Sequence, residues 1–490
     1  MFRNLCSTLV LATLGWVSGA QAQAAAPTQP TPKPSSASAR RSVPKQSAAD
    51  FAYRNATTPP ISGWTGPVFQ LSHSYPQQDP GTCPSTVCTW LANEKVSFTG
   101  VPAQGQAPAQ WTPAWQEYMQ QLLAYIREGQ DLQLDNTAGW QLKVKDTTRW
   151  FHMPWMAYDS KQGREFIHGL TNERTASLSD FHGQLQLQKG VNALSTGKGL
   201  RETAEGYETW AFGVYNEWGG YAIGRTWQPD GKPLTTERLG GPQPAGLPFP
   251  DGTLVAKLLF TTATPQDVSY LQGSPVWQAY RHVEWNDQYL CERQVQEVRL
   301  VQLDVAVVDH RSPTRWVFGT FAYNGEVNGA TVWDRLVPVG VQWGNDPWSW
   351  PATSRADSLA LIQSVINPAI IQTQHLGCHG RLAGPVDNRA SSCMACHANG
   401  YTPPAGKTED ANTIPPLFGF NDMCVVSSPD NANYFTNNLF PMPYAGGQYP
   451  NLMNMDTSLQ MWVAFLQYGQ FNQVGQPKAC VEPNGKSSSR

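Results

Sequence analysis

The stretch Val298-Arg299-Leu300-Val301-Gln302-Leu303-Asp304-Val305-Ala306-Val307-Val308 carries the clearest structural pattern in the chain. Two sets of side chains alternate along it: the mixed set Leu300, Gln302, Asp304 and Ala306, and the wholly apolar set Val301, Leu303, Val305 and Val307. Successive side chains of a β-strand point to opposite faces, and β-branched residues favour extended backbone. The stretch therefore predicts a strand with one face turned toward an apolar core.

Working outward from this strand, four more segments are rich in aromatic and β-branched residues and are bounded by Gly, Pro or Asn turns. They are 209–215, 220–227, 253–261 and 316–323. Together they predict an antiparallel sheet or sandwich, with an insertion loop over 231–250. Apolar residues at three- and four-residue spacing predict helices over 111–129 and 359–371, and a last helix over 457–468 capped by Asp456. The fold class expected is α+β, with a β-rich body and a mainly helical and loop C-terminal region.

Composition and the first residues predict an exported chain. A basic start, an apolar run and the small-residue site near Ala22 are typical of a cleavable signal peptide over 1–22. The expected order is then a Pro/Ala/Ser linker over 23–50, a body over 51–380, a C-terminal functional region over 381–480 and a tail over 481–490. No later segment reaches the ~20 apolar residues that a bilayer span needs. We expect a periplasmic protein without a membrane span.

Net charge limits the range of partners. The formal charge is −3, and charged residues make up only 14% of the chain. Such a balance provides no basic surface for nucleic acid or for anionic lipid, so we expect neither as a partner.

The functional signal is Cys393-Met394-Ala395-Cys396-His397. Two thiols three residues apart, followed directly by an imidazole, are the attachment pattern of a c-type haem. Cys393 and Cys396 would each add to one haem vinyl group, and His397 would ligate the iron from the proximal side. The alternatives are a redox-active Cys pair or half of a zinc site, but a zinc site needs a second Cys/His pair at matching spacing. We expect one covalent haem c, with its iron.

Six further cysteines remain after the predicted signal peptide, and an oxidising compartment allows them to form three disulfides. The short loop between Cys83 and Cys88 is the first expectation. Six thiols allow 15 pairings. Cys424 with Cys480 is the second expectation, since that bond would join the tail to the haem region, and Cys291 with Cys378 is the pair that remains.

The region 385–475 resembles the small class I c-type cytochromes, because a haem-bearing helix is followed by a long loop and a C-terminal helix. In that family a Met in the loop, often followed by Pro, supplies the sixth iron ligand. The resemblance implies this role for Met442 in Pro441-Met442-Pro443, with Met423, Met453 and Met455 as alternatives and simple packing as the other possibility.

Residues 207–397 also resemble the cytochrome P-460 and cytochrome c′-β family. The patches that carry this resemblance are Tyr215-Asn216-Glu217, the segment from Phe249 to Lys257, the segment from Leu303 to Asp309, Trp316-Val317-Phe318 and the Cys-x-x-Cys-His motif. The family implies a small β-sheet fold with one c-type haem and an open distal side. In its catalytic members the Lys at the position of Lys257 is cross-linked to the haem. A nearby carboxylate would serve as proton acceptor, and Glu217, Asp304 and Glu284 are candidates.

Three functions follow as expectations. The first is single-electron transfer by an exported monohaem cytochrome that docks a redox partner protein. The second is an enzyme or gas-binding protein with five-coordinate iron, acting on hydroxylamine or nitric oxide. The third is an extracellular ligand-binding module with an accessory haem, since exposed Trp and Tyr suit flat ligands.

Overall fold

The computed structural model describes residues 71–100, 106–135, 138–156, 169–172, 207–238, 241–285, 288–347, 361–370, 376–377, 380–384, 392–403 and 452–474. The predicted signal peptide and linker, Met442 and the disulfides expected for Cys291, Cys378, Cys424 and Cys480 lie outside this description. Within it, no helix combines the length and the apolar content that a membrane crossing requires.

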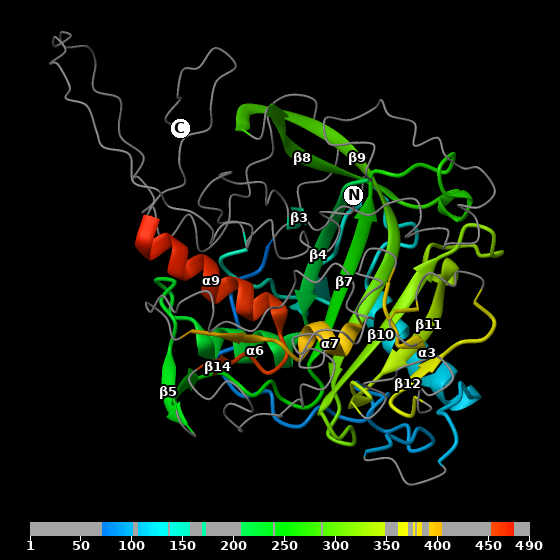
Figure 1. Ribbon diagram of the computed structural model, residues 1–490, viewed down its shortest axis with the longest axis horizontal. Coiled ribbons are helices and arrows are strands. Elements are labelled where there is room, and N and C mark those ends of the chain that lie inside the picture. The colour runs from blue at the N-terminus through cyan, green and yellow to red at the C-terminus, as the bar shows by residue number, and fades with distance from the viewer. Residues whose placement is uncertain are drawn as a thin grey trace, which may run out of the picture.

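One antiparallel sheet of eight strands organises the body (Figure 1). Its order is β12-β11-β10-β9-β7-β4-β3, and β8 pairs with β9. The strands are β3 (Leu170–Asn172), β4 (Thr209–Tyr215), β7 (Leu254–Thr261), β8 (Val276–Trp285), β9 (Gln288–Val308), β10 (Trp316–Tyr323), β11 (Leu336–Gln342) and β12 (Ser364–Ile366). The alternating stretch 298–308 lies wholly in β9, between β7 and β10, and the expected antiparallel sheet is confirmed.

Three two-stranded sheets and four α-helices complete the described part of the chain. The small sheets pair β1 (Lys143–Val144) with β2 (Thr147–Thr148), β5 (Thr235–Arg238) with β6 (Gly241–Pro244), and β13 (Tyr401–Thr402) with β14 (Met453–Asn454). The helices are α3 (Pro113–Arg127), α6 (Glu217–Thr226), α7 (Cys393–His397) and α9 (Leu459–Val474), and η1 (Ser269–Leu271) and η2 (Trp333–Arg335) are short 3-10 turns. The class is therefore α+β with a β-rich body.

Helix α3 covers one face of the sheet, as its apolar spacing predicts. Trp115, Met119 and Leu122 are buried in a cluster that also contains Leu303, Val305 and Val307 of β9. The ring of Trp115 stacks on Trp343 at 4.8 Å. A Cβ on Gly319 of β10 would lie 2.9 Å from the sulfur of Met119, so the missing side chain allows this close approach of helix and sheet.

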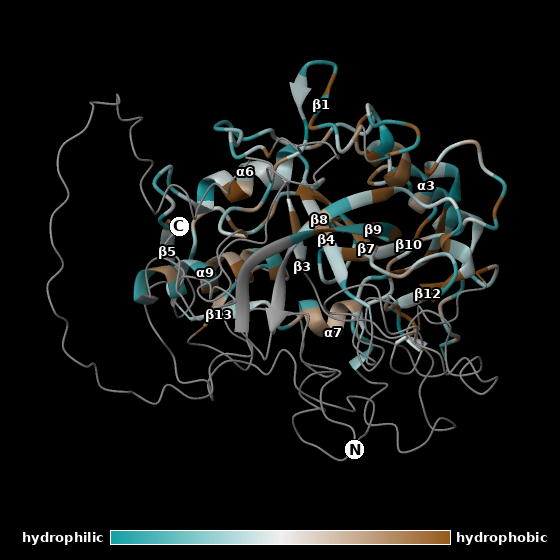
Figure 2. Cartoon of the chain, turned by 90° about the horizontal axis from the view of Figure 1, so that it is seen from above, coloured by the Kyte–Doolittle hydropathy of each residue, from teal (hydrophilic) through white to brown (hydrophobic). Residues whose placement is uncertain are grey.

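Helices α7 and α9 cover the opposite face. Figure 2 shows α3 on one side of the central strands and α7 on the other. A second apolar cluster joins α9 to the end of β9 and to β10, through residues such as Trp462, Val308 and Phe318. Asp304 and Ala306 of the mixed set therefore face α7 and α9, whereas Leu300 lies in the cluster under α3.

A buried ionic network closes the end of β9. Asp309 is fully buried and accepts two hydrogen bonds from the Arg311 guanidinium, at 2.9 and 2.6 Å, and one from the Tyr118 hydroxyl at 3.1 Å. The same guanidinium donates to the backbone carbonyls of Asn93 and Trp90. These hydrogen bonds connect the segment after the Cys83–Cys88 disulfide to the sheet. This disulfide was predicted, and within the described residues it is the one that is present.

Four local predictions were wrong. Residues 220–227, expected as a strand, lie mainly in helix α6, where Asn216 caps the first turn by accepting from Gly219 N–H. The expected helix over 359–371 contains strand β12, which pairs with β11 because that sheet edge offers hydrogen-bond partners. The expected insertion loop 231–250 contains the β5–β6 hairpin. Helix α9 is capped by Ser458, whose Oγ accepts from Met461 N–H, and not by Asp456.

Candidate haem-binding site

The Cys-x-x-Cys-His motif forms one short helix, α7. Ser392 caps it, since its Oγ accepts a hydrogen bond from Ala395 N–H at 3.2 Å. The Gln342 side chain of β11 accepts from Met394 N–H at 3.1 Å and anchors this turn to the sheet. Cys393, Cys396 and His397 stand at positions i, i+3 and i+4, which share one face of a helix. Neither cysteine is in a disulfide, and Cys396 is buried whereas Cys393 is partly exposed.

The His397 imidazole is fixed by the chain that precedes α9. Its Nδ1 lies 2.7 Å from the backbone carbonyl oxygen of Thr457. A carbonyl only accepts hydrogen bonds, so Nδ1 carries the proton and Nε2 keeps its lone pair. This arrangement, in which one ring nitrogen donates to a carbonyl, orients histidines that ligate metals through the other nitrogen.

The electrostatic surroundings keep this imidazole neutral. The pKa of His397 is lowered to about 4, mainly by burial; the Thr457 carbonyl opposes this shift and the positive charge of Lys257 adds to it. Neutral imidazole is the form that binds a metal ion. The Phe318 ring packs beside it, with ring centroids 4.4 Å apart.

An unusual backbone turn presents the Thr457 carbonyl. Asp456 and Thr457 have φ values of +48° and +63°, a region that residues with side chains seldom occupy. The Asp456 carboxylate accepts from Phe249 N–H at 2.9 Å and lies 3.5 Å from Arg315, and Tyr215 and Ser458 share a hydrogen bond of 2.8 Å between their hydroxyls. These contacts to the sheet hold the strained turn in place, which suits a functional role for it.

A polar stripe crosses the sheet face on which α7 lies. Lys257 of β7 is directly opposite Asp304 of β9 in the antiparallel register. The Asp304 carboxylate accepts from Thr320 Oγ1 at 2.9 Å and from Gln302 Nε2 at 3.0 Å. Lys257 and Asp304 are both partly exposed. The tertiary structure thus brings Lys257 and Asp304, two residues singled out from sequence, to the same face as His397.

The other sequence candidates do not join this group. Glu217 lines a separate cleft near Arg149, and burial raises its pKa. The side chain of Glu284, and all of Met442 and Met423, lie outside the described residues. Met453 and Met455 are fully buried in the apolar cluster with α9. Met455 directly precedes the Asp456–Thr457 turn.

The residues present fit a covalently attached haem. Two cysteines outside any disulfide and an imidazole that keeps the lone pair of Nε2 share one helical face, which is the donor set that haem c requires. Gln342 Nε2 and Gln302 Oε1 are buried in this region without a hydrogen-bond partner, which is unusual in a finished interior and indicates space for a polar ligand group. Gln342 Nε2 and Lys257 would serve as donors to the haem carboxylates.

Sequence reasoning missed Thr457, Phe318 and Asp456, which hold or flank the imidazole. Thr457 is 60 residues from His397 in the chain. Its neighbour Asp456 could be read as a helix cap, and that reading concealed the turn. No protein-family model, curated protein or solved structure matches this chain.

Proposed function

We propose that the chain is an exported, periplasmic monohaem c-type cytochrome that transfers single electrons to and from a redox partner protein. Cys393 and Cys396 would hold the haem, and His397 would be its proximal ligand. One observation carries the proposal: both thiols share a helical face with an imidazole whose Nδ1 is held 2.7 Å from the Thr457 carbonyl, leaving Nε2 as a ligand.

When bound, haem c supplies an iron centre that accepts and releases one electron. The chain contributes the orientation of the ligand and the surroundings of the centre. The Thr457 carbonyl increases the electron density on the imidazole through Nδ1–H, which favours the oxidised state of a ligated iron. Phe318 and the methionines around α9 exclude water from the proximal side. We further propose Met442 as the sixth ligand, on its resemblance to the loop methionine of class I cytochromes.

The first test is covalent haem content. The exported protein, produced with a c-type haem attachment system, is expected to retain one haem per chain on a denaturing gel and in a pyridine absorbance assay. Cys393→Ser with Cys396→Ser should retain none, and Met394→Leu, a control inside the motif, should retain one. Loss of haem in the control alone, or retention in the double variant, would contradict the proposal.

A second candidate function rests on Lys257 and Asp304. Both lie on the sheet face that carries α7, and the charge of Lys257 reaches His397 strongly enough to lower its pKa. This placement supports a P-460-like enzyme or gas-binding protein, in which Lys257 bonds to the haem and Asp304 accepts protons from a substrate such as hydroxylamine.

Absorption spectra separate the two functions. Electron transfer with Met442 as ligand predicts low-spin iron in both oxidation states, no change on adding carbon monoxide, and loss of the low-spin spectrum in Met442→Ala. The enzyme predicts a ferrous haem that binds carbon monoxide and a red-shifted ferrous spectrum that reverts in Lys257→Met. Lys232→Met, which replaces an exposed lysine, is the matched control.

A further inference from the structure

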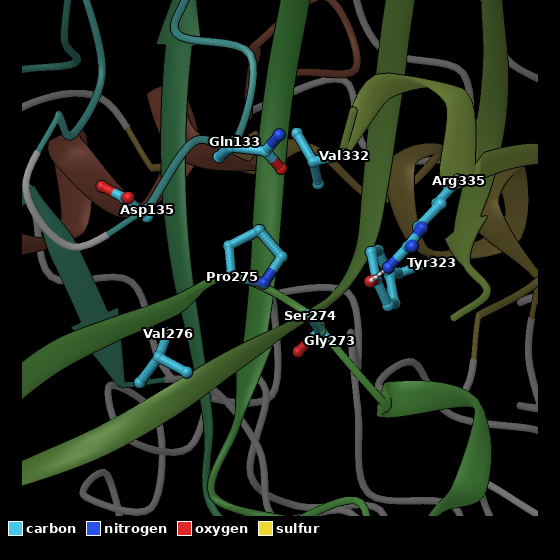
Figure 3. Close-up of a pocket in the computed structure, with 9 residues that line it drawn as sticks. All are labelled: Gln133, Asp135, Gly273, Ser274, Pro275, Val276, Tyr323, Val332 and Arg335. Atoms are coloured by element: carbon cyan, nitrogen blue, oxygen red, sulfur yellow. Dashed lines mark hydrogen bonds between the residues drawn. The ribbon is translucent and has the colours of Figure 1, made fainter. Parts of the chain in front are cut away.

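A second cavity lies on the α3 side of the sheet, apart from α7. Three segments enclose it: residues 133–135 after α3, residues 273–276 before β8, and the turn from β10 to η2 (Figure 3). Its volume is about 340 Å³. Two lining residues, Tyr323 and Val332, belong to the apolar cluster that contains α3. A cavity of this size holds a small organic molecule.

Arg335 brings an unneutralised positive charge to this cavity. Its Nη1 donates to the Tyr323 hydroxyl at 3.3 Å, and its Nε is buried without a hydrogen-bond partner. Within the described part of the chain no carboxylate forms an ion pair with this guanidinium. Gly273 allows its approach, because a Cβ there would lie 2.9 Å from Nη1. A guanidinium has five N–H donors, arranged so that two of them can bind one carboxylate. Within the described residues, the Arg335 guanidinium donates to one side chain, that of Tyr323.

Ser274 supplies an independent observation. The residue is only 5% exposed, and its hydroxyl is buried without a hydrogen-bond partner while lining the same cavity. A buried hydroxyl with no partner carries an energetic cost. Because the hydroxyl has almost no exposed surface, it would rotate about the Cα–Cβ bond to reach a ligand oxygen, and that hydrogen bond would remove the cost. Figure 3 places Ser274 beside Gly273, on the side of the cavity toward Tyr323 and Arg335.

The remaining walls define the rest of the ligand. Pro275, Val276 and Val332 are apolar and suit a hydrocarbon body. Asp135 also lines the cavity, and Figure 3 draws it across from Arg335. A single cation matches the charge of one carboxylate better than the double charge of a phosphate ester.

We propose that this cavity binds a small monocarboxylate, with its carboxylate on Arg335 and Ser274 and its apolar body against Pro275, Val276 and Val332. The site is independent of the haem motif and adds a ligand-binding function to the β-rich body.

The test adds sodium benzoate or sodium butyrate to the full chain and measures binding by saturation-transfer NMR and by calorimetry. Benzamide is the neutral control ligand. We expect saturable binding of a carboxylate, at least tenfold weaker binding by Arg335→Gln, weaker binding by Ser274→Ala, and an intermediate effect of Arg335→Lys. Arg225→Gln, which replaces an exposed arginine on α6, should bind as the unmodified chain does.

Circular dichroism establishes whether each variant is folded, and Arg335→Lys and Ser274→Ala provide the comparison if Arg335→Gln is not. Absence of binding by both carboxylates, equal binding by Arg335→Lys, Ser274→Ala and the unmodified chain, or equal affinity for benzamide and benzoate would each overturn the proposal.

Discussion

Replacing Arg311 by methionine is expected to lower the free energy of unfolding by about 3–5 kcal/mol, the cost of removing one partner from a buried ion pair. The guanidinium makes four hydrogen bonds: two to the Asp309 carboxylate and one each to the Trp90 and Asn93 carbonyls. Asp309 is fully buried, so water cannot take the place of the lost donors.

Two further variants distinguish the effect of the Arg311 charge from the effect of its hydrogen-bond geometry. Arg311→Lys keeps the charge but cannot reproduce the planar fork, so we expect about half of the loss. Adding Asp309→Asn to Arg311→Met removes the uncompensated charge and should recover part of the stability, giving a coupling energy between the two sites.

Urea unfolding followed by tryptophan fluorescence measures these differences, provided that the transition is two-state. Arg225→Met, at an exposed position, should change the free energy of unfolding by no more than about 0.5 kcal/mol. A loss below about 1 kcal/mol for Arg311→Met would refute the reasoning, because it would mean that water reaches the Asp309 carboxylate.

Three other perturbations test the core. Burial holds the pKa of His152 well below 6.5, so the unfolded chain binds a proton there more readily than the folded chain. Stability should therefore fall as pH drops from 7 to 5, by at most about 2 kcal/mol, and His152→Asn should remove that part of the pH slope in urea titrations. A Cβ at Gly246 would collide with a backbone carbonyl of α6, so Gly246→Ala should lower the free energy of unfolding by about 1–3 kcal/mol. A Cβ at Gly469 on α9 would meet no atom within 4 Å, so Gly469→Ala should raise that free energy by about 0.5–1 kcal/mol. Equal effects of the two substitutions would contradict this packing. Replacing Cys83 and Cys88 by serine should lower the free energy of unfolding by about 2 kcal/mol in the same assay, because the disulfide restricts the unfolded chain over a sequence separation of five. No change would indicate that the two thiols are reduced in the unmodified chain.

The alternation of apolar and polar residues predicted a strand correctly where the two faces of that strand meet different surroundings in the folded chain. The predicted alternation holds over the second half of 298–308, where Leu303, Val305 and Val307 pack under α3 and Asp304 faces α7. It breaks at Leu300 and Val301, where the register between β7 and β9 shifts: Leu300 lies in the cluster under α3 and Val301 in a separate cluster. The stretch 220–227 also contains aromatic and β-branched residues but lies mainly in α6, because the Asn216 cap initiates a helix there. The short β12 depends on an edge of β11 that no local pattern reveals.

The amino-acid sequence by itself determined the donor set of the candidate site, because Cys393, Cys396 and His397 are adjacent and one helical turn brings them to one face. It also determined the strand that carries Asp304. Only the tertiary structure decided what surrounds the imidazole. The Thr457 carbonyl, the Phe318 ring and the charge of Lys257 come from segments far apart in the chain. Hydrogen bonds and electrostatic effects of this kind depend on distance in space, which sheet register and helix packing establish and spacing along the chain does not.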